Sequence, residues 1–369
     1  MKIFIFCIIR LFLSLLKLFP LNKKTFFFES YQGEQFSCNP RAVFEYLKNK
    51  NCNCTFIWSA KKFSNFPDDV KKVHPKTFLY YFYLITSKYV ITNIELSSFI
   101  PKKKNAIWIN TWHGGGAFKR VEHEEKTFYQ KLTKKLVSIK TNFYISSSRK
   151  FSEVMQESTG IQKEKFISVG MPRNDVLFDN EKINLINKNF RRKFNISEED
   201  FVVLYAPTYR GNLNSPFDIN LDFEKFYKKV QVVTNRKAKF LFRAHHAMLG
   251  NFNFDNNYII DVTNYMDIQD LLCVSDFLIT DYSSIIWDYS LLKKSAALFV
   301  PDLQEYQNER GFYTPIETWP FPFYKTNEEL CKNFSVNVNI QKIEQYHKSM
   351  GSYETGHSCE SVFNLITEK

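Results

Sequence analysis

Short apolar runs alternate with segments of helical spacing along most of this chain. Residues 25–30 form an apolar run of strand length, and residues 40–49 place apolar side chains three and four positions apart, as one face of a helix does. Further runs of strand length end in polar turns, at 54–60, 88–93, 106–114, 142–148 and 165–175. Because strands separated by helices build parallel sheets, the pattern predicts an α/β fold.

The polar and charged segment 179–200 predicts a linking helix between two such units. A second alternation follows it, with apolar runs at 201–208, 239–246, 258–263, 276–284 and 296–301. We therefore expect two Rossmann-like domains that face a cleft, over residues 21–178 and 201–369. In sheets of this kind, ligands bind outside the carboxyl ends of the strands.

The first twenty residues form a separate apolar segment. Within residues 3–19, the charged side chains are Arg10 and Lys17 alone. The segment is shorter than a membrane-spanning helix needs to be. The two cations are seven positions apart and share a helix face, which suits a helix lying in the membrane plane. No small-residue cleavage site follows, which disfavours a signal peptide. We expect residues 1–20 to associate with a membrane, and a buried core helix is the alternative.

Composition narrows the class of protein and of partner. The 369 residues are 44% hydrophobic, which excludes a disordered chain and suffices for two domains with cores. The net charge of +12 fits nucleic acid, an anionic membrane surface or a phosphorylated substrate. The seven cysteines are scattered, so we expect neither a disulfide framework nor a zinc site and favour a reducing compartment.

The first candidate for chemistry is His113, which ends the apolar run at 106–114. It is followed by three glycines and two cations: Gly114, Gly115, Gly116, Lys119 and Arg120. The glycines permit positive φ angles and close backbone approach, so amide N–H groups could converge on an anion. The spacing is neither that of a P-loop nor that of a dinucleotide-binding motif. A tight turn with an incidental histidine is the alternative to a catalytic role.

The second candidate is the strand at 240–246, which delivers Arg243, His245 and His246. Arg243 and His245 are two positions apart and point to the same face of a strand. That face suits a phosphate, whereas His246 faces the other way and is interpreted as structural.

The third candidate is the strand end at 281–284, where Asp281, Ser283 and Ser284 precede a helical run. Hydroxyls and unpaired N–H groups at a helix start can bind an anion, although N-capping alone explains one such residue. Three further polar residues at strand ends or turns could contact phosphate: Thr208, Arg210 and Arg310. The chain has no Asp-x-Asp pair, so we expect no cofactor and no metal, with phosphate neutralised by Arg, His and Ser.

In this order and spacing the segments resemble the CDP-glycerol glycerophosphotransferase family, the primases and polymerases of teichoic acid and related capsules. The resemblance extends over residues 25–365 and rests on FESYQGEQFSCNPRAVFEYL, TWHGGGAFKR, VGMPRND, YAPTYRG, FRAHH, TDYSSIIWDY, ERGFY and GSYETGHSCESVFNLI. The family usually has His-Gly-Thr-Pro-Leu-Lys at the second segment. Here Gly115 and Gly116 replace Thr-Pro, which predicts a less rigid loop and leaves the acceptor open.

The resemblance implies a GT-B-like fold in a peripheral enzyme at the cytoplasmic face of the membrane. It implies that the first domain binds a lipid-linked polyol-phosphate or saccharide acceptor, with the glycine loop and Lys119 on that side, and that the second binds CDP-glycerol. It also implies that His113 and His245 are the essential histidines. We expect His113 to be the general base for the acceptor hydroxyl, with CMP as the leaving group. Charge on the diphosphate would be stabilised by Arg243, His245, Ser283, Ser284 and Arg310.

Two other enzymatic interpretations stay open: a CDP-ribitol-dependent ribitol phosphate transferase and a GT-B nucleotide-sugar glycosyltransferase. A basic nucleic-acid-binding protein is the non-enzymatic alternative. Its cations would gather on one motif with interleaved aromatic residues, whereas here they are spread over the chain, so we expect no nucleic-acid partner. Primase or polymerase action and the oligomeric state are left open by the sequence.

Overall fold

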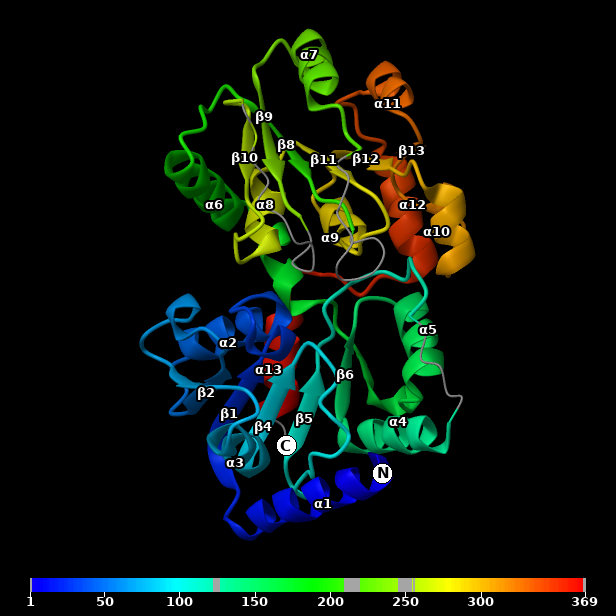
Figure 1. The fold of residues 1–369 in the computed structure, drawn as a ribbon. Helices are drawn as coiled ribbons and strands as arrows, with labels where there is room; N and C mark the ends of the chain where they lie inside the picture. The colour runs from blue at the N-terminus through cyan, green and yellow to red at the C-terminus, as the bar shows by residue number, and fades with distance from the viewer. Residues whose placement is uncertain (1, 122–126, 209–219, 245–253, 255, 368–369) are drawn as a thin grey trace. The chain divides into compact units, whose positions relative to one another are not determined.

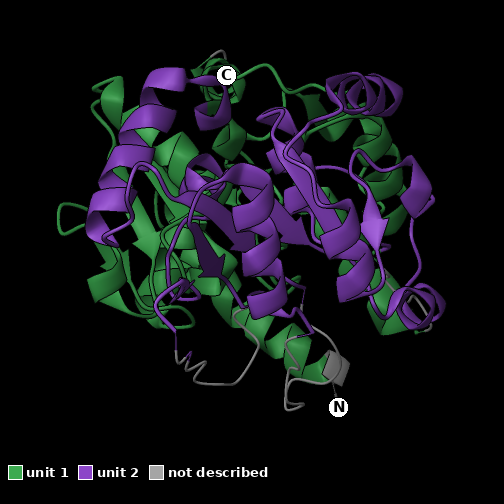
Figure 2. Cartoon of the chain, turned by 90° about the horizontal axis from the view of Figure 1, so that it is seen from above, with its two compact units in different colours: residues 1–113, 121–175, 352–369 green, residues 114–120, 176–351 purple. Residues whose placement is uncertain are grey.

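The computed structural model describes residues 2–121, 127–208, 220–244, 254 and 256–367 (Figure 1). The chain forms two compact units, which Figure 2 colours separately. Unit 1 comprises Met1–His113, Val121–Asp175 and Ser352–Lys369, and unit 2 comprises Gly114–Arg120 and Val176–Gly351. Each unit contains one parallel sheet, so the predicted α/β fold is confirmed.

Unit 1 is built on a seven-stranded sheet in the order β3-β2-β1-β4-β5-β6-β7. The strands are β1 (Asn22–Glu29), β2 (Thr55–Ser59), β3 (Lys71–Val73), β4 (Ser87–Thr92), β5 (Ile107–Asn110), β6 (Phe143–Ser146) and β7 (Phe166–Ser168). The helices are α1 (Lys2–Ser14), α2 (Cys38–Asn49), α3 (Phe78–Thr86), α4 (Phe128–Lys140), α5 (Arg149–Thr159) and α13 (Ser358–Thr367). Parallel sheets are covered on both faces, so their central strands are apolar on both sides. Phe26 and Phe28 accordingly lie in the core layer shared with α2 and α13, whereas Phe27 lies in the opposite layer with α3.

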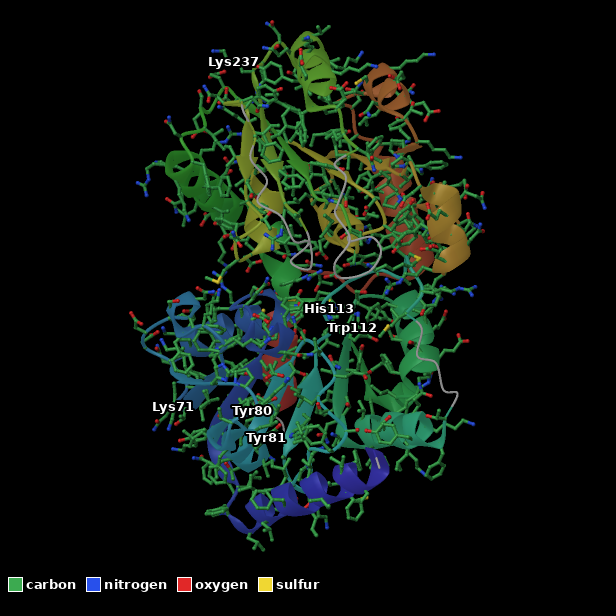
Figure 3. All side chains as sticks on the ribbon, in the orientation of Figure 1. Lys71, Tyr80, Tyr81, Trp112, His113 and Lys237 are labelled. Atoms are coloured by element: carbon green, nitrogen blue, oxygen red, sulfur yellow. The ribbon has the colours of Figure 1, made fainter. Side chains whose placement is uncertain are left out.

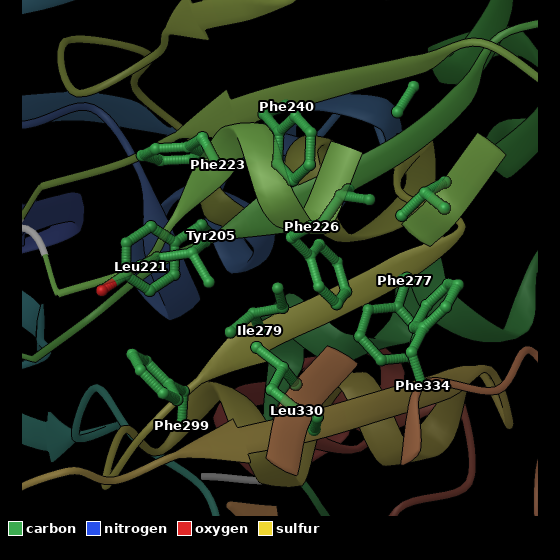
Figure 4. Close-up of a cluster of buried hydrophobic side chains, with 14 of the residues drawn as sticks. Tyr205, Leu221, Phe223, Phe226, Phe240, Phe277, Ile279, Phe299, Leu330 and Phe334 are labelled. Atoms are coloured by element: carbon green, nitrogen blue, oxygen red, sulfur yellow. The ribbon is translucent and has the colours of Figure 1, made fainter. Parts of the chain in front are cut away.

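Unit 2 is built on a six-stranded sheet in the order β10-β9-β8-β11-β12-β13. The strands are β8 (Phe201–Tyr205), β9 (Ala238–Phe242), β10 (Ile259–Asp261), β11 (Phe277–Thr280), β12 (Ser295–Phe299) and β13 (Phe323–Tyr324). The helices are α6 (Asn180–Lys193), α7 (Phe223–Thr234), α8 (Ile268–Val274), α9 (Ile285–Leu291), α10 (Leu303–Glu309), α11 (Asn327–Asn333) and α12 (Ile340–Met350). One core layer is strongly aromatic: Phe226 of α7 lies edge-on to Phe334, with ring centroids 5.0 Å apart (Figure 4).

Both sheets change the direction of their strand order near the centre. In unit 1 the chain proceeds outward from β1 to β3 and then returns to place β4 on the other side of β1. Unit 2 repeats this arrangement with β8 to β10 and then β11. The carboxyl ends of the strands at such a switch point are where open α/β sheets bind ligands. The candidate residues at 113–116, 208 and 281–284 follow strands at or next to these two switch points.

The bounds of the two units are not those of the predicted domains: residues 1–20 belong to unit 1, and the predicted linker 179–200 belongs to unit 2. Residues 352–369 belong to unit 1, because Val362 of α13 is buried in the core layer that covers β1. Residues 114–120 lie between β5 and β6 along the chain but belong to unit 2. They are held there by Phe118, whose ring lies 4.8 Å from that of Trp319.

The amino-terminal segment forms α1 and a short 3₁₀ helix, η1 (Leu15–Leu18), along the lower edge of unit 1 in Figure 1. Leu13 and Leu16 are buried in the core layer that contains α3. Phe4, Leu11 and Phe12 are 70%, 72% and 64% exposed. The segment is therefore partly a core element and partly an exposed apolar surface. Within the described part of the chain, no helix has the length and apolar character needed to cross a membrane.

Candidate functional site

His113 lies just beyond β5 in unit 1, and its ring is oriented by a backbone carbonyl. Its Nδ1 is 2.8 Å from the carbonyl oxygen of Asn93, the residue that follows β4. A carbonyl can only accept, so the hydrogen bond requires the proton to be on Nδ1. A neutral His113 therefore carries its basic lone pair on Nε2. This is the tautomer that a general base with a fixed orientation needs.

Two aromatic residues in strained backbone conformations flank the His113 ring. Trp112 has a φ of 52° and its ring stacks on His113 with centroids 4.4 Å apart (Figure 3). Tyr31, just beyond β1, has a φ of 47° and its ring centroid is 5.7 Å from that of His113. The backbone N–H of Tyr31 donates to the side chain of Asn93. Positive φ is unfavourable for bulky residues, and such strain gathers at functional sites.

The glycine loop lies in unit 2, against residues of the predicted serine cluster. A Cβ at Gly114 would lie 2.8 Å from Oγ of Ser284, and a Cβ at Gly115 would lie 2.2 Å from Cδ1 of Trp287. Gly116 has a φ of 71°. The loop therefore needs glycine for close approach at two positions and for backbone conformation at the third. Two of the three predicted clusters are brought together here.

Thr208 and Asp281 meet at the carboxyl ends of β8 and β11. The Asp281 carboxylate accepts hydrogen bonds from the Thr208 backbone N–H at 2.8 Å and from the Thr208 hydroxyl. It also accepts from the N–H of Tyr282. Asp281 is buried and binds the two strand ends to each other. Its two predicted companions are more open: both serines are half-buried, and Ser284 makes no side-chain cap bond to α9.

The structure describes only some of the cationic residues that were predicted to bind phosphate in unit 2. Arg243 follows β9, and its Nη1 donates to the carbonyl of Tyr265 at 2.8 Å. His245, its predicted partner on the same strand face, lies outside the described residues, as do His246 and Arg210. The geometry of the second histidine therefore stays a prediction.

Two segments far apart in the sequence pair in unit 2. Lys119 forms an antiparallel bridge with Phe312, and the N–H of Arg120 donates to the carbonyl of Gly311 at 3.1 Å. The pairing places the half-buried Lys119 close to the turn that carries the exposed Arg310. The end of the glycine loop and the ERGFY segment therefore pair with each other, and together they carry the cations Lys119, Arg120 and Arg310.

Three residues around His113 were not predicted from the sequence: Asn39, Asn93 and Arg173. All three bind the backbone or ring of the 111–113 segment. Asn39 precedes a proline and Arg173 follows one. Their position next to a proline was the available signal in the sequence. In the described part of the chain, no three His, Cys, Asp or Glu side chains are grouped so as to hold a metal ion.

The family model for CDP-glycerol:poly(glycerophosphate) glycerophosphotransferases matches residues 11–368. A teichoic acid poly(glycerol phosphate) polymerase of Bacillus spizizenii is 31% identical over 94% of this chain and 92% of its own length. The corresponding polymerase of Bacillus subtilis is 32% identical over 94% of this chain, which spans only 49% of that longer protein. A structure of the wall teichoic acid polymerase TagF soaked with CDPG has a TM-score of 0.86 at 27% identity, covering 98% of this chain and 92% of that one.

The fold and these likenesses define an enzyme that transfers a substituted phosphate group. More specifically, the chain belongs to the CDP-glycerol:poly(glycerophosphate) glycerophosphotransferase family. The resemblance drawn from the motifs is confirmed, and so are the enzyme class and the transfer of glycerol phosphate from CDP-glycerol that the family performs.

Proposed function

We propose that this chain transfers glycerol phosphate from CDP-glycerol onto a hydroxyl of a lipid-linked polymer of the teichoic-acid or capsule type and releases CMP. The observation that carries the proposal is the hydrogen bond between Nδ1 of His113 and the Asn93 carbonyl. It leaves the basic lone pair of the neutral ring on Nε2, at the ligand-binding edge of the unit 1 sheet.

In the proposed step, Nε2 of His113 takes the proton of the acceptor hydroxyl as its oxygen attacks the phosphorus that bears glycerol. The bond from that phosphorus to the oxygen of CMP breaks, and CMP leaves with the electron pair. A neutral alcohol is a weak nucleophile at pH 7, and a positioned base contributes about 10²- to 10⁴-fold in rate. This is the reason for assigning the base role to the histidine whose tautomer is held.

Charge on the diphosphate needs donors that do not repel it. We assign the Ser283 and Ser284 hydroxyls, Arg243 and Arg310 to this role, with His245 and Arg210 as further predicted contacts. Thr208 and Asp281 support the site from behind, because the carboxylate is already occupied by the Thr208 and Tyr282 donors. A negative carboxylate would also repel the donor phosphates.

We propose a GT-B-like arrangement in which unit 1 provides the acceptor side and unit 2 the nucleotide side. The likeness to TagF over 98% of the chain supports this proposal. The relatives also include a teichoic acid ribitol-phosphate primase at 26% identity. The experiment must therefore compare CDP-glycerol with CDP-ribitol as donors.

The test is CMP release from CDP-glycerol and from CDP-ribitol, with a lipid-linked polyol-phosphate acceptor. We expect release with CDP-glycerol and a loss of at least about 100-fold in His113→Ala. Release with CDP-ribitol alone would overturn the donor assignment. Near-normal turnover by a folded His113→Ala would overturn the base assignment.

We also propose that α1 docks the enzyme on the cytoplasmic face of an anionic membrane as a peripheral protein. The exposed apolar side chains of α1 and η1 support this, among them Phe4, Leu11, Phe12 and Leu18. Arg10 does not share this exposed role, because its Nη1 donates to the carbonyl of Ser98. Insertion of an apolar helix face supplies the binding free energy, and cations add attraction to anionic lipids.

Cosedimentation with phosphatidylglycerol-containing vesicles tests the docking of α1. We expect the double variant Leu11→Ser and Phe12→Ser to stay in the supernatant. Leu185 and Val232 of unit 2 are 59% and 81% exposed and supply the matched control, Leu185→Ser with Val232→Ser. Equal pelleting of the two double variants would refute docking through α1.

A further inference from the structure

Two buried polar residues outside the predicted site hold the backbone that presents His113. Asn39 lies in the first turn of α2 and is fully buried, and Arg173 lies in the 3₁₀ helix η5 (Pro172–Phe178) after β7 with 5% of its surface exposed. They contact each other, because the backbone N–H of Arg173 donates to Oδ1 of Asn39 at 3.0 Å. They form one polar pair built from two distant parts of unit 1.

This pair binds three successive carbonyl groups. Nδ2 of Asn39 donates to the carbonyls of Thr111 and Trp112, each at 3.0 Å. Nη1 of Arg173 donates to the carbonyl of His113 at 2.8 Å. The segment has already left β5, so these carbonyls no longer belong to the sheet ladder. Buried and partly buried carbonyls need such partners, and here the partners are side chains; the Trp112 carbonyl also accepts from the Thr111 hydroxyl at 3.3 Å.

These hydrogen bonds hold a segment whose backbone conformation is unfavourable. Trp112 has a φ of 52°, which is unfavourable for a residue with a bulky side chain. Such a conformation persists only when the surrounding structure imposes it. The carbonyls on both sides of Trp112, and its own, are the ones that Asn39 and Arg173 bind. A relaxation of Trp112 would rotate the adjoining peptide and carry the His113 ring with it.

We propose that Asn39 and Arg173 are positioning residues for the transfer reaction, which act by holding residues 111–113 so that His113 presents Nε2 to the acceptor hydroxyl. The proposal rests on the proposed base role of His113. Neither residue needs to touch substrate, so their loss should lower kcat far more than it raises KM. Misplacement of a reacting group by about 1 Å costs up to about 100-fold.

Two substitutions remove these donors with little change in shape. Asn39→Asp keeps the oxygen that accepts from Arg173 but loses the Nδ2 donor to Thr111 and Trp112. Arg173→Met loses the donor to His113, and Arg173→Lys retains a shorter cationic donor. We expect kcat for CMP release to fall about 10- to 100-fold in Asn39→Asp and Arg173→Met, with KM changed less than about threefold. Arg173→Lys should recover part of the lost kcat.

Arg191 of unit 2 provides the matched control for loss of a buried arginine. Its side chain is also buried, and its Nη1 donates to the carbonyls of Ser197 and Asp200. Arg191→Met should lower thermal stability as Arg173→Met does, with kcat measured below the melting transition unchanged. Equal kcat values for the two folded methionine variants would overturn the proposal.

A spectroscopic readout separates this proposal from the base assignment. Long-range ¹H–¹⁵N correlations of the imidazole rings, assigned with His113→Ala, report the tautomer and the titration of His113. We expect the wild type to hold the tautomer protonated at Nδ1 and Asn39→Asp and Arg173→Met to lose that preference or shift the titration. Unchanged His113 signals in both variants would overturn the positioning role. Turnover by His113→Ala decides the base role independently.

Discussion

Among the three glycines of the loop, Gly115 is the one whose replacement by alanine should lower stability and activity most. In Gly115→Ala the new Cβ would lie 2.2 Å from Cδ1 and 2.7 Å from Nε1 of Trp287, whereas ordinary contact begins near 3.4 Å. The loop or the indole must therefore move by about 1.2 Å. Trp287 is fully buried, with His347 4.5 Å away by ring centroids, so the loop is the part that yields.

The magnitude follows from this overlap. Gly115 does not have a positive φ, so alanine adds no backbone strain and the steric overlap acts alone. Overpacking a buried site costs about 1 to 3 kcal/mol in stability. The loop continues directly from His113, and a displacement of about 1 Å lowers kcat up to about 100-fold. We expect both losses together, measured by thermal melting and by CMP release.

A second substitution, at Trp287, tests whether the overlap with the indole causes these losses. Trp287→Leu removes the atoms that the new methyl group meets, at its own cost of about 2 to 4 kcal/mol for the lost packing. In a double-mutant cycle, Gly115→Ala with Trp287→Leu should show a favourable coupling of at least about 1 kcal/mol and recover part of kcat. Gly116→Ala is the control, because its Cβ would meet Phe118 instead and its φ is 71°. Strict additivity in the Gly115 cycle, or normal melting and kcat in Gly115→Ala, would refute the account.

Three buried titratable groups give further predictions about stability. Burial raises the pKa of Glu29 above its ordinary value of about 4.5, so wild-type stability falls as the pH rises from that value. Glu29→Gln should therefore gain stability relative to the wild type as the pH rises, measured by urea titration. A difference in stability that does not change with pH would contradict this. Burial lowers the pKa of Lys140 to about 7, so stability rises with pH between 7 and about 10.5. Lys140→Met should lose about 1.4 kcal/mol relative to the wild type per pH unit in that range, and parallel urea curves at pH 7 and 9 would exclude this. Burial lowers the pKa of His347 to about 4, so wild-type melting temperatures should drop from pH 6.5 towards 4, whereas those of His347→Leu should drop less.

The sheets could be predicted because burial on both faces leaves continuous apolar runs. Residues 26–28 and 277–280 show this pattern, and each run is a buried strand. The unit boundaries could not be predicted in the same way. Residues 352–369 return to unit 1 through contacts with strands far earlier in the chain, and a local pattern carries no information on such contacts. The crossing of residues 114–120 into unit 2 was missed for the same reason.

The candidate site was predictable where function depends on residue type at a strand end. His113 and Ser284 follow the carboxyl ends of β5 and β11, as the pattern indicated. Asn39 and Arg173 were not predicted because they bind backbone carbonyls, which every residue has, so only the neighbouring proline marks them in the sequence. For Asp281, the sequence indicated the residue but not its contacts. Its position beside two serines indicated phosphate binding, but its burial and its bonds to Thr208 are visible only in three dimensions.

The glycine triplet shows how a departure from a family motif can be offset by packing. From the sequence, Gly-Gly in place of Thr-Pro predicts a less rigid loop. In the structure all three glycines are buried, and Gly114 and Gly115 lie directly against Ser284 and Trp287. A proline restricts a loop through its own ring, whereas these glycines restrict it by allowing other side chains to reach the backbone. Close packing at this position therefore depends on Gly115 and Trp287 together, and the two should be exchanged as a pair when this loop is engineered.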